Sequence, residues 1–486
     1  MIDSSCIGAT IRLHRNESTE AMLSSVSGTT SDLTTRPQAE TDAYAAGASS
    51  HRSSQMMRIG IGFCVFAIAM VLADTVFVEW RKEALSWPVL SAGAIGWGLL
   101  VSSEALKKRL TSPIALERFC TLAVFSGFLA LYAVTSFPAT PYNEEVRQAV
   151  AFLQGHTYID APKDYLEAAQ VGPYRYALHP PLPAIMLVPF VALWGMATDQ
   201  ALWSLFIGAI DMALAWRLLG RFRLSPGARV WLTVFFGAGT ILWFETITGN
   251  TWALPETVSV LFTLAALDEA FGSARPLLLG SYAGLAALSR YELALAGFTY
   301  AALALKRGRR IRDIFWMVPG FAAVGAVFVG YNEARYASFF DQGVTLTGPS
   351  YGPAFGLRYL LGNLSTVFLM EPGLNEHFPY VHISYIGQSV TFTSPAFLLA
   401  FKAYLGKLEP VLMLLTAIVI SIPSLLCYAN GFAQFGTRHY LQVFPFLLVM
   451  MAMGMRRADR LTKILIVTSI IFIAYGVVYV HIWGLF

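Results

Sequence analysis

Long apolar runs recur from residue 58 onward, and they constrain the fold more than any other feature of the sequence. Hydrophobic residues make up 56% of the 486 residues and charged residues only 13%. A soluble domain of this size does not need so much apolar side chain. A run of about 20 apolar residues is long enough to cross a bilayer as a helix. The sequence therefore predicts an all-α fold, a polytopic transmembrane helix bundle.

The runs define about 13 candidate spans, of which about 11 follow residue 115. They are 58–79, 88–103, 116–136, 199–219, 228–247, 253–271, 276–289, 291–305, 313–333, 393–405, 409–428, 440–455 and 461–485. Residues 1–56 are rich in Ser, Thr, Ala and Gly and lack an apolar period, so we expect a disordered cytoplasmic tail there. Residues 57–115 then form an extra N-terminal transmembrane hairpin, and residues 116–486 form the main transmembrane domain.

The composition excludes several classes of site. The four cysteines, Cys6, Cys64, Cys120 and Cys427, are far apart and show no CxxC spacing, so neither a disulfide framework nor a zinc site is indicated. No basic face or RNA- or DNA-binding motif predicts a nucleic-acid partner. No metal-ligand spacing supports a divalent cation. The partners that the composition does predict are membrane lipids.

The stretch GPYRYALHPPLPAIMLVPFVALWGM contains an apolar run, 184–196, that is too short to cross a bilayer. At a rise of roughly 1.5 Å per residue it reaches about 20 Å, against a hydrocarbon core of about 30 Å. Pro189 inside the run weakens a spanning helix further. We therefore expect a juxtamembrane helix lying flat at the membrane surface, with His179 at the boundary where this helix begins.

The distribution of Lys and Arg gives the orientation of the chain. Downstream of residue 196, most of these residues lie in loops on one side of the predicted bundle: 217–229, 275, 306–312, 402–407 and 456–463. The opposite side carries only Arg290, Arg335, Arg358 and Arg438. The positive-inside rule makes the first side cytoplasmic, together with the N-terminus. The two long loops, 137–198 and 334–392, then lie on the outer face, where functional residues tend to gather.

The first outer loop holds the candidate catalytic residues. Glu144 and Glu145 come first, and the residues after them form the apolar stripe of an amphipathic surface helix: Val146, Val150 and Leu153. A carboxylate pair at a membrane surface suits proton abstraction from an acceptor hydroxyl. Asp164 is a further candidate for the base. The competing interpretation is that these acids are simply solvated in a wet loop.

Polar residues near the outer ends of the predicted spans are candidates for substrate binding. The set is Asn143, Tyr176, His179, Glu245, Asn250, Arg290, Arg438, His439 and Tyr440. Arg290 lies between two apolar runs, so it needs either a lipid phosphate or an ion pair with Glu292 or Glu245. His179 either lines a cavity or caps the start of the surface helix. We expect these groups to converge on a cavity at the outer leaflet.

The order of several motifs resembles the GT-C superfamily of polytopic glycosyltransferases, which includes protein O-mannosyltransferases and lipid A aminoarabinose transferases. After the acidic loop come AVAFLQGHTYI, then HPPLP, then WRLLGRFRLS. They are followed by GTILWFETITGNTW, LAALSRYELALA, YNEARYASFFDQG and FGTRHYLQVFPFLL, in the order found in uncharacterised bacterial members. The likeness covers roughly residues 115–460.

This resemblance implies a transferase that takes a sugar from a polyprenyl-phosphate carrier. The sugar would pass, with inversion, to a glycan, lipid or protein acceptor on the outer face of a bacterial inner membrane. An acidic residue of the first outer loop would act as base, and basic residues would hold the carrier phosphate. The usual Asp-Glu pair falls here on Pro141 and Tyr142, so Glu144 or Glu145 is the expected base and Asp164 the reserve. No cofactor besides the donor is firmly implied.

Two other classes of function stay open at this point. One is a transporter or flippase of a lipid-linked glycan, for which polar residues near the bilayer midplane are typical. Asp211, inside the predicted span 199–219, is the main residue of that kind. The other is a non-catalytic assembly subunit, which the displaced acidic pair would suit.

Overall fold

The computed structural model describes residues 55, 57, 58, 111–136, 140–162, 168–339, 343, 353–429, 431 and 433–484. The predicted tail and N-terminal hairpin therefore lie outside the described residues, apart from residues 55, 57, 58 and 111–115. The spans predicted at 58–79 and 88–103 lie almost wholly outside them. Cys6, Cys64 and Asp164 also lie outside the described residues.

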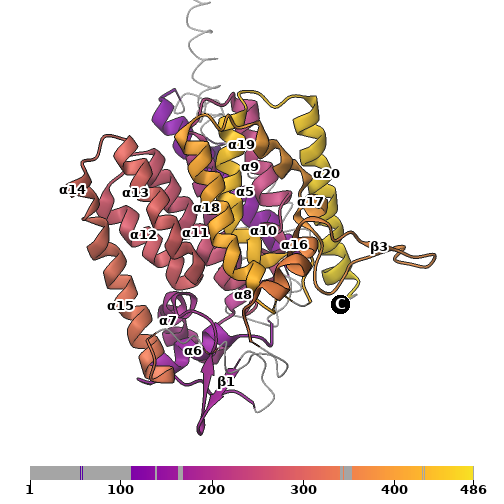
Figure 1. Cartoon of the computed structure of the whole chain (residues 1–486). Coiled ribbons are helices and arrows are strands. Elements are labelled where there is room, and N and C mark those ends of the chain that lie inside the picture. The colour runs from indigo at the N-terminus through magenta and orange to yellow at the C-terminus, as the bar shows by residue number, and fades with distance from the viewer. Residues whose placement is uncertain are drawn as a thin grey trace, which may run out of the picture.

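The described part of the chain is mostly helical (Figure 1). Within it, five helices are long and apolar enough to cross a membrane. They are α5 (Pro113–Thr135), α8 (Gln200–Leu219), the helix formed by α14 (Ile311–Ile314) with α15 (Met317–Tyr336), α18 (Leu408–Leu426), and α20 (Arg460–Val477) with its last turns. Shorter helices fill the bundle between them: α11 (Leu254–Phe271), α12 (Pro276–Ser289), α13 (Ala296–Lys306) and α19 (Phe444–Gly454).

Several predicted spans are not single straight helices. The span predicted at 228–247 forms α9 (Pro226–Ala238) and α10 (Leu242–Thr248), bent by 46° at the glycine-containing break between them. The pair counts as a sixth candidate span if it crosses as one unit. The span predicted at 393–405 forms α17 (Val390–Thr393) and a 3₁₀-helix, Pro395–Lys402. At a rise of about 2.0 Å per residue, this 3₁₀-helix is too short to cross a bilayer.

The first outer loop contains both expected helices. The amphipathic stripe forms α6 (Glu144–Leu153), and the short apolar run forms α7 (Leu182–Trp194), so these two helix predictions are confirmed. Between them lies a hairpin that the all-α prediction did not include, β1 (Ala168–Val171) paired antiparallel with β2 (Tyr174–Ala177). Gly172 begins its two-residue turn with a φ of +57°, a conformation that glycine adopts without strain.

The second outer loop is also partly ordered into short elements. It contains α16 (Leu360–Phe368) and a small antiparallel sheet of β3 (Gly373–Leu374) and β4 (Val381–His382). In Figure 1 the elements of the first outer loop lie at the lower end of the molecule, whereas α16 and β3 lie at about mid-height, with β3 extending to the right.

Helix α15 forms one wall of the bundle and packs closely on α12. A Cβ atom at Gly280 would lie 2.0 Å from the carbonyl oxygen of Met317, and one at Gly320 would lie 2.7 Å from that of Leu277. Small residues at these positions let the two backbones approach, as in many membrane helix pairs. The lower end of α15 thereby reaches α6 and α7 (Figure 1).

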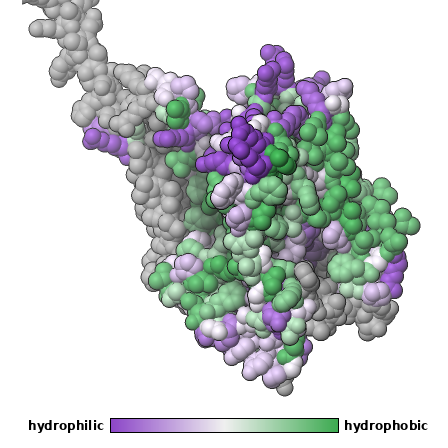
Figure 2. Space-filling model, turned by 60° about the vertical axis from the view of Figure 1, so that its left-hand side comes forward, coloured by the Kyte–Doolittle hydropathy of each residue, from purple (hydrophilic) through white to green (hydrophobic). Residues whose placement is uncertain are grey.

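Basic side chains lie at the other end of the bundle, in the loops that precede α9, α12, α14, α18 and α20. Figure 2 shows hydrophilic surface gathered at this upper end and hydrophobic surface over the middle. Some of these cations are paired with acids. Asp268, for example, lies 3.1 Å from Nη2 of Arg217 and 2.8 Å from Nε of Arg221. This distribution of hydrophilic and hydrophobic surface fits a membrane protein.

Candidate functional site

Two adjacent carboxylates begin α6. Glu144 is fully buried and Glu145 is 1% exposed, although the sequence places both in the predicted first outer loop. They occupy the first turn of the helix, where the positive end of the helix dipole favours an acidic side chain. Buried acids are rare unless they are paired or hydrogen-bonded. The groups that pair with these two carboxylates therefore decide how they can be buried.

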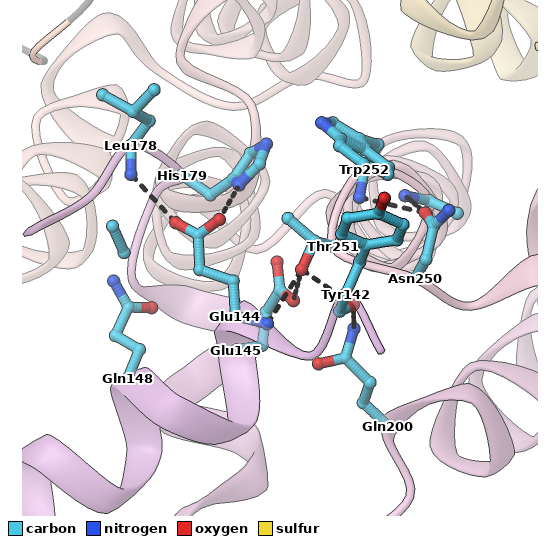
Figure 3. A network of polar contacts seen from close by, with 12 residues as sticks. Tyr142, Glu144, Glu145, Gln148, Leu178, His179, Gln200, Asn250, Thr251 and Trp252 are labelled. Carbon is cyan, nitrogen blue, oxygen red and sulfur yellow. Dashed lines mark hydrogen bonds and ion pairs between the residues drawn. The ribbon is translucent and has the colours of Figure 1, made fainter. Parts of the chain in front are cut away.

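Glu144 contacts the segment between β2 and α7. One carboxylate oxygen, Oε1, accepts the backbone N–H of Leu178 at 2.9 Å. The other, Oε2, lies 3.4 Å from Nδ1 of His179 (Figure 3). The prolines that follow His179 start α7 at Leu182, so the histidine is held just before that helix. His179 therefore contacts Glu144 of the acidic pair, and it also lies directly before the prolines that start α7.

Thr251 joins both acids to the turn between α10 and α11. Its Oγ1 accepts the backbone N–H of Glu144 at 2.8 Å and lies 3.3 Å from Oε2 of Glu145. The same hydroxyl lies 2.9 Å from the carbonyl oxygen of Tyr142. Gln200, at the start of α8, donates to the carbonyl of Gly249 in that turn at 3.2 Å. The start of α6 is thus fixed from two neighbouring elements (Figure 3).

Burial gives Glu145 an unusual proton affinity. Desolvation raises the pKa of its carboxyl from 4.5 to about 8, with His179 opposing the shift and Glu144 adding to it. Oε1 of Glu145 has no hydrogen-bond partner among the described residues. At neutral pH this carboxyl is therefore mostly protonated.

A second buried group surrounds Arg290. Its guanidinium lies 3.2 Å from Oε1 of Glu256 and 3.1 Å from Oε1 of Glu292. Nη2 also lies 3.1 Å from Nδ1 of His439. Of the two ion pairs expected from the sequence, the structure forms the one with Glu292, and Glu256 takes the place proposed for Glu245. The side chain of Arg290 is 17% exposed, so most of the group is shielded from solvent.

The two groups are electrically contiguous. The charge of His179 acts on Glu145 on one side, and on Glu256 and His439 on the other. Arg438 in turn acts on Glu245 and on Glu256. The structure therefore brings most of the predicted residues into one region, at the end of the bundle where α6 begins.

Other predicted residues have positions that suggest packing or capping. The side chain of Asn143 accepts a hydrogen bond from Nε of Arg147 at 3.0 Å, and Asn250 accepts the backbone N–H groups of residues 252 and 253 at the start of α11. Tyr176 lies in β2 with its ring 5.9 Å from that of Tyr336. Tyr440 is buried, and its hydroxyl has no partner among the described residues.

An apolar groove begins at Phe152, two turns along α6 from the acidic pair. It has a volume of about 460 Å³ and runs between α6, α7 and α15. Its lining includes Phe152, Ile185, Val188, Val327 and Tyr331. The Tyr331 hydroxyl also contacts the side-chain amide of Gln148, one turn along α6 from the acids. The volume is in the range of small-molecule sites, and the lining suits a hydrocarbon chain.

Several residues of this region were not among those predicted. Glu256 begins α11, and an acid inside a predicted span was a signal for it. Thr251 and Gln200 are ordinary polar residues whose role depends on tertiary contacts, so the sequence contains no signal for them. Arg335 on α15 is 2% exposed. Its neighbours come from distant parts of the chain, so its burial could not be inferred from the sequence around it.

Among the described residues, no three His, Cys, Asp or Glu side chains are grouped so as to hold a metal ion. No protein-family model, curated protein or solved structure matches the chain.

Proposed function

We propose that this protein is an integral membrane glycosyltransferase. It takes a sugar from a polyprenyl-phosphate carrier and passes it, with inversion, to a glycan, lipid or protein acceptor at the outer face of the membrane. The proposal starts from the order of motifs that resembles the GT-C superfamily. The observation that carries it further is the buried pair Glu144 and Glu145, of which Glu144 contacts His179, at the start of a helix that lines an apolar groove further along.

The proposed reaction needs one group that accepts a proton. A carboxylate takes the proton from the acceptor hydroxyl, and the hydroxyl oxygen forms a bond to the anomeric carbon of the sugar. The bond between that carbon and the phosphate oxygen breaks, and its electron pair stays on the phosphate. The products are the glycosylated acceptor and the polyprenyl phosphate. A positioned base contributes about 10²- to 10⁴-fold to such a step.

Glu144 is the better candidate for the base. Its carboxylate receives the Leu178 N–H and faces His179, and both contacts stabilise negative charge. Glu145 is mostly protonated at neutral pH because burial raises its pKa to about 8. A protonated carboxyl donates a hydrogen bond and cannot accept the proton. Asp164 remains the reserve candidate, outside the described residues.

The experiment uses the purified protein in lipid nanodiscs. A panel of radiolabelled polyprenyl-phosphate sugars is offered with a membrane extract as acceptor, and loss of label from the carrier is followed. Wild type is compared with Glu144→Gln, Glu145→Gln and the double variant. Glu376→Gln, an exposed glutamate of the second outer loop, is the matched control.

We expect wild type and Glu376→Gln to consume one donor, and Glu144→Gln to lose at least about 100-fold of that rate. Equal consumption by the double variant and wild type would move the base to Asp164. No consumption of any donor by wild type would remove the transferase proposal.

One observation favours a second function, transport of a lipid-linked glycan. Asp211 in α8 is fully buried, and neither carboxylate oxygen has a hydrogen-bond partner among the described residues. Unpaired acids inside spans are typical of proton and substrate pathways. Movement of a labelled lipid-linked glycan between the leaflets of proteoliposomes, abolished by Asp211→Asn but not by Glu144→Gln, would support this function over the transferase.

A further inference from the structure

The loop between α13 and α14 holds the densest group of cations in the sequence. Residues 306–312 read KRGRRIR, so five of these seven residues are Lys or Arg. Asp313 is the single acid among residues 306–318. In Figure 1 this loop lies at the upper left of the bundle, at the end opposite to α6 and the acidic pair. A basic group next to a membrane span is typical of sites for anionic lipids.

Ion pairs distinguish this loop from other basic loops at the same end. Two of those loops contain arginines that carboxylates neutralise: Arg217 and Arg221 with Asp268 at 3.1 Å and 2.8 Å, and Arg275 with Glu269 at 2.8 Å. Within the described residues, no carboxylate pairs with the guanidinium of Arg307 or Arg310. Arg312 is 71% exposed, and its Nε lies 3.9 Å from Asp313, a loose surface pair. The described residues therefore leave much of the charge of this loop uncompensated.

The backbone of the loop is fixed by hydrogen bonds. Arg309 donates from Nε to the carbonyl oxygen of Ala274 at 3.0 Å and from Nη2 to that of Ser273 at 2.7 Å. The carboxylate of Asp313 accepts the backbone N–H of Arg310 at 3.0 Å. These contacts hold the loop against the turn between α11 and α12. A ligand that meets the loop therefore needs little further ordering of its backbone.

Large apolar side chains stand next to these cations. Ile311, Phe315 and Trp316 are 66%, 69% and 64% exposed. The backbone at residues 315 and 316 keeps right-handed helical angles, so Trp316 lies one turn from Arg312 on the same face. Aromatic residues beside cations are typical of the headgroup level of a membrane.

The length of this helix places the loop at that level. Ile311–Tyr336 is a candidate span of 26 residues, which extends for about 39 Å at a rise of about 1.5 Å per residue. The hydrocarbon core measures about 30 Å, so the span is longer than the core. At its far end, the ring of Tyr336 lies 5.9 Å from that of Tyr176 in the first outer loop. The first turn, with Arg312 and Trp316, therefore reaches the headgroups of the opposite leaflet.

We propose that loop 306–312 and the turn after it bind the headgroup of an anionic phospholipid. The guanidiniums of Arg310 and Arg312 contact the charged headgroup, and Phe315 and Trp316 pack against the upper part of the acyl chains. The positive-inside rule makes this the cytoplasmic leaflet, whose surface potential is negative. The site lies at the opposite end of the bundle from Glu144, so it goes beyond the proposed transfer reaction and does not depend on it.

A second pair of exposed arginines offers a matched comparison. Arg456 and Arg457 precede α20 at the same end of the bundle, and no carboxylate among the described residues pairs with them. No Phe, Tyr or Trp occurs in residues 456–471. This pair attracts anionic lipids through charge alone, an interaction that salt screens at the surface.

The test titrates the purified protein in neutral detergent with three probes. They are short-chain phosphatidylglycerol, phosphatidylcholine with the same chains, and inorganic phosphate. Affinity is read from the ligand dependence of the unfolding temperature, because a ligand that binds the folded state stabilises it. The variants are Arg310→Gln/Arg312→Gln and Trp316→Ala, all at exposed positions. The control, Arg456→Gln/Arg457→Gln, removes the same charge from the other pair.

Wild type and the control should bind phosphatidylglycerol at least about tenfold more tightly than phosphatidylcholine, since each cation near the headgroup adds to the attraction. Arg310→Gln/Arg312→Gln should lower this preference to about threefold or less, because the cations that contact the headgroup are gone. Trp316→Ala should weaken both lipids by a similar factor and keep the preference, because it removes apolar contact and no charge.

Three results would overturn the proposal. Equal losses of preference in the two double variants would make the effect one of net charge and not of a site. Stabilisation by inorganic phosphate that matches that by phosphatidylglycerol, and that needs Arg310 and Arg312, would make the site one for a free anion. Equal affinity of wild type for the two lipids would show that the loop does not recognise the anionic headgroup.

Discussion

Nδ1 of His179 lies 3.4 Å from Oε2 of Glu144, so the residue that precedes the surface helix α7 contacts the first residue of α6. The contact links two segments of the first outer loop that enclose the β-hairpin. It also places an imidazole nitrogen beside the carboxylate. The two residues are therefore expected to act as a unit in the proposed reaction.

We predict that His179→Gln lowers donor consumption at least about tenfold, because it removes the group that orients and stabilises the Glu144 carboxylate. Added to Glu144→Gln, the same change should cause little further loss, since residues that act together show non-additive effects. Rates of label release from the donor check both points. His377→Gln, an exposed histidine of the second outer loop, is the control. Full additivity of the two losses would show that the residues act independently.

The pKa of Glu145 predicts how stability changes with pH. The folded protein holds this proton from pH 4.5 up to about pH 8, whereas the unfolded chain has already released it. The stabilisation is complete below pH 4.5 and is lost as the pH rises through about 8. We expect the unfolding temperature of wild type to fall between about pH 4.5 and pH 8 more steeply than that of Glu145→Gln, which is neutral throughout. Parallel curves for the two proteins would contradict the raised pKa.

The contact between α12 and α15 predicts a strong effect of a single methyl group. Gly280→Ala would place Cβ 2.0 Å from the Met317 carbonyl oxygen, so the helices must separate. Overpacking of this kind costs about 1–3 kcal/mol, seen as a lower unfolding temperature in detergent. Gly297→Ala in α13 is the matched change, because no atom lies within 4 Å of the added Cβ. A similar loss in both variants would show that the loss does not arise at the α12–α15 crossing.

The orientation is tested by accessibility of single cysteines. With the native cysteines replaced by serine, Tyr174→Cys in the hairpin should react with a membrane-impermeant maleimide on intact cells. Arg457→Cys, in the exposed basic loop before α20, should react only after the membrane is permeabilised. The expectation follows from the positive-inside rule. The opposite pattern of labelling would place the acidic pair on the cytoplasmic side.

Local pattern predicts a good part of this fold. The stripe of Val146, Val150 and Leu153 has the period of a helix, and the length of the run at 184–196 excludes a span, so α6 and α7 follow from the sequence. The hairpin between them does not, because two four-residue strands give too little alternation to detect. Its one signal is Gly172-Pro173, a turn pair that indicates a change of direction without saying what flanks it.

In the candidate site, too, the sequence reveals some residues but not the contacts they make. Glu144 and Glu145 are visible in the sequence because carboxylates near apolar runs are rare. Their burial, and the contact with His179, depend on how the hairpin folds back on α6, which one sequence does not encode locally. The same holds for Arg335: arginines near span ends are common, whereas the burial of this one is a property of the packed structure.

The hydroxyl of Thr251 carries a single hydrogen, yet it lies within reach of two acceptors, Oε2 of Glu145 and the carbonyl oxygen of Tyr142. An ionised Glu145 attracts that hydrogen, and a protonated one leaves it to Tyr142. The ring of Tyr142 in turn lies 4.8 Å from that of Trp252. The direction in which the Thr251 hydroxyl donates therefore depends on whether Glu145 is charged. One of its two acceptors, Tyr142, belongs to the aromatic pair with Trp252.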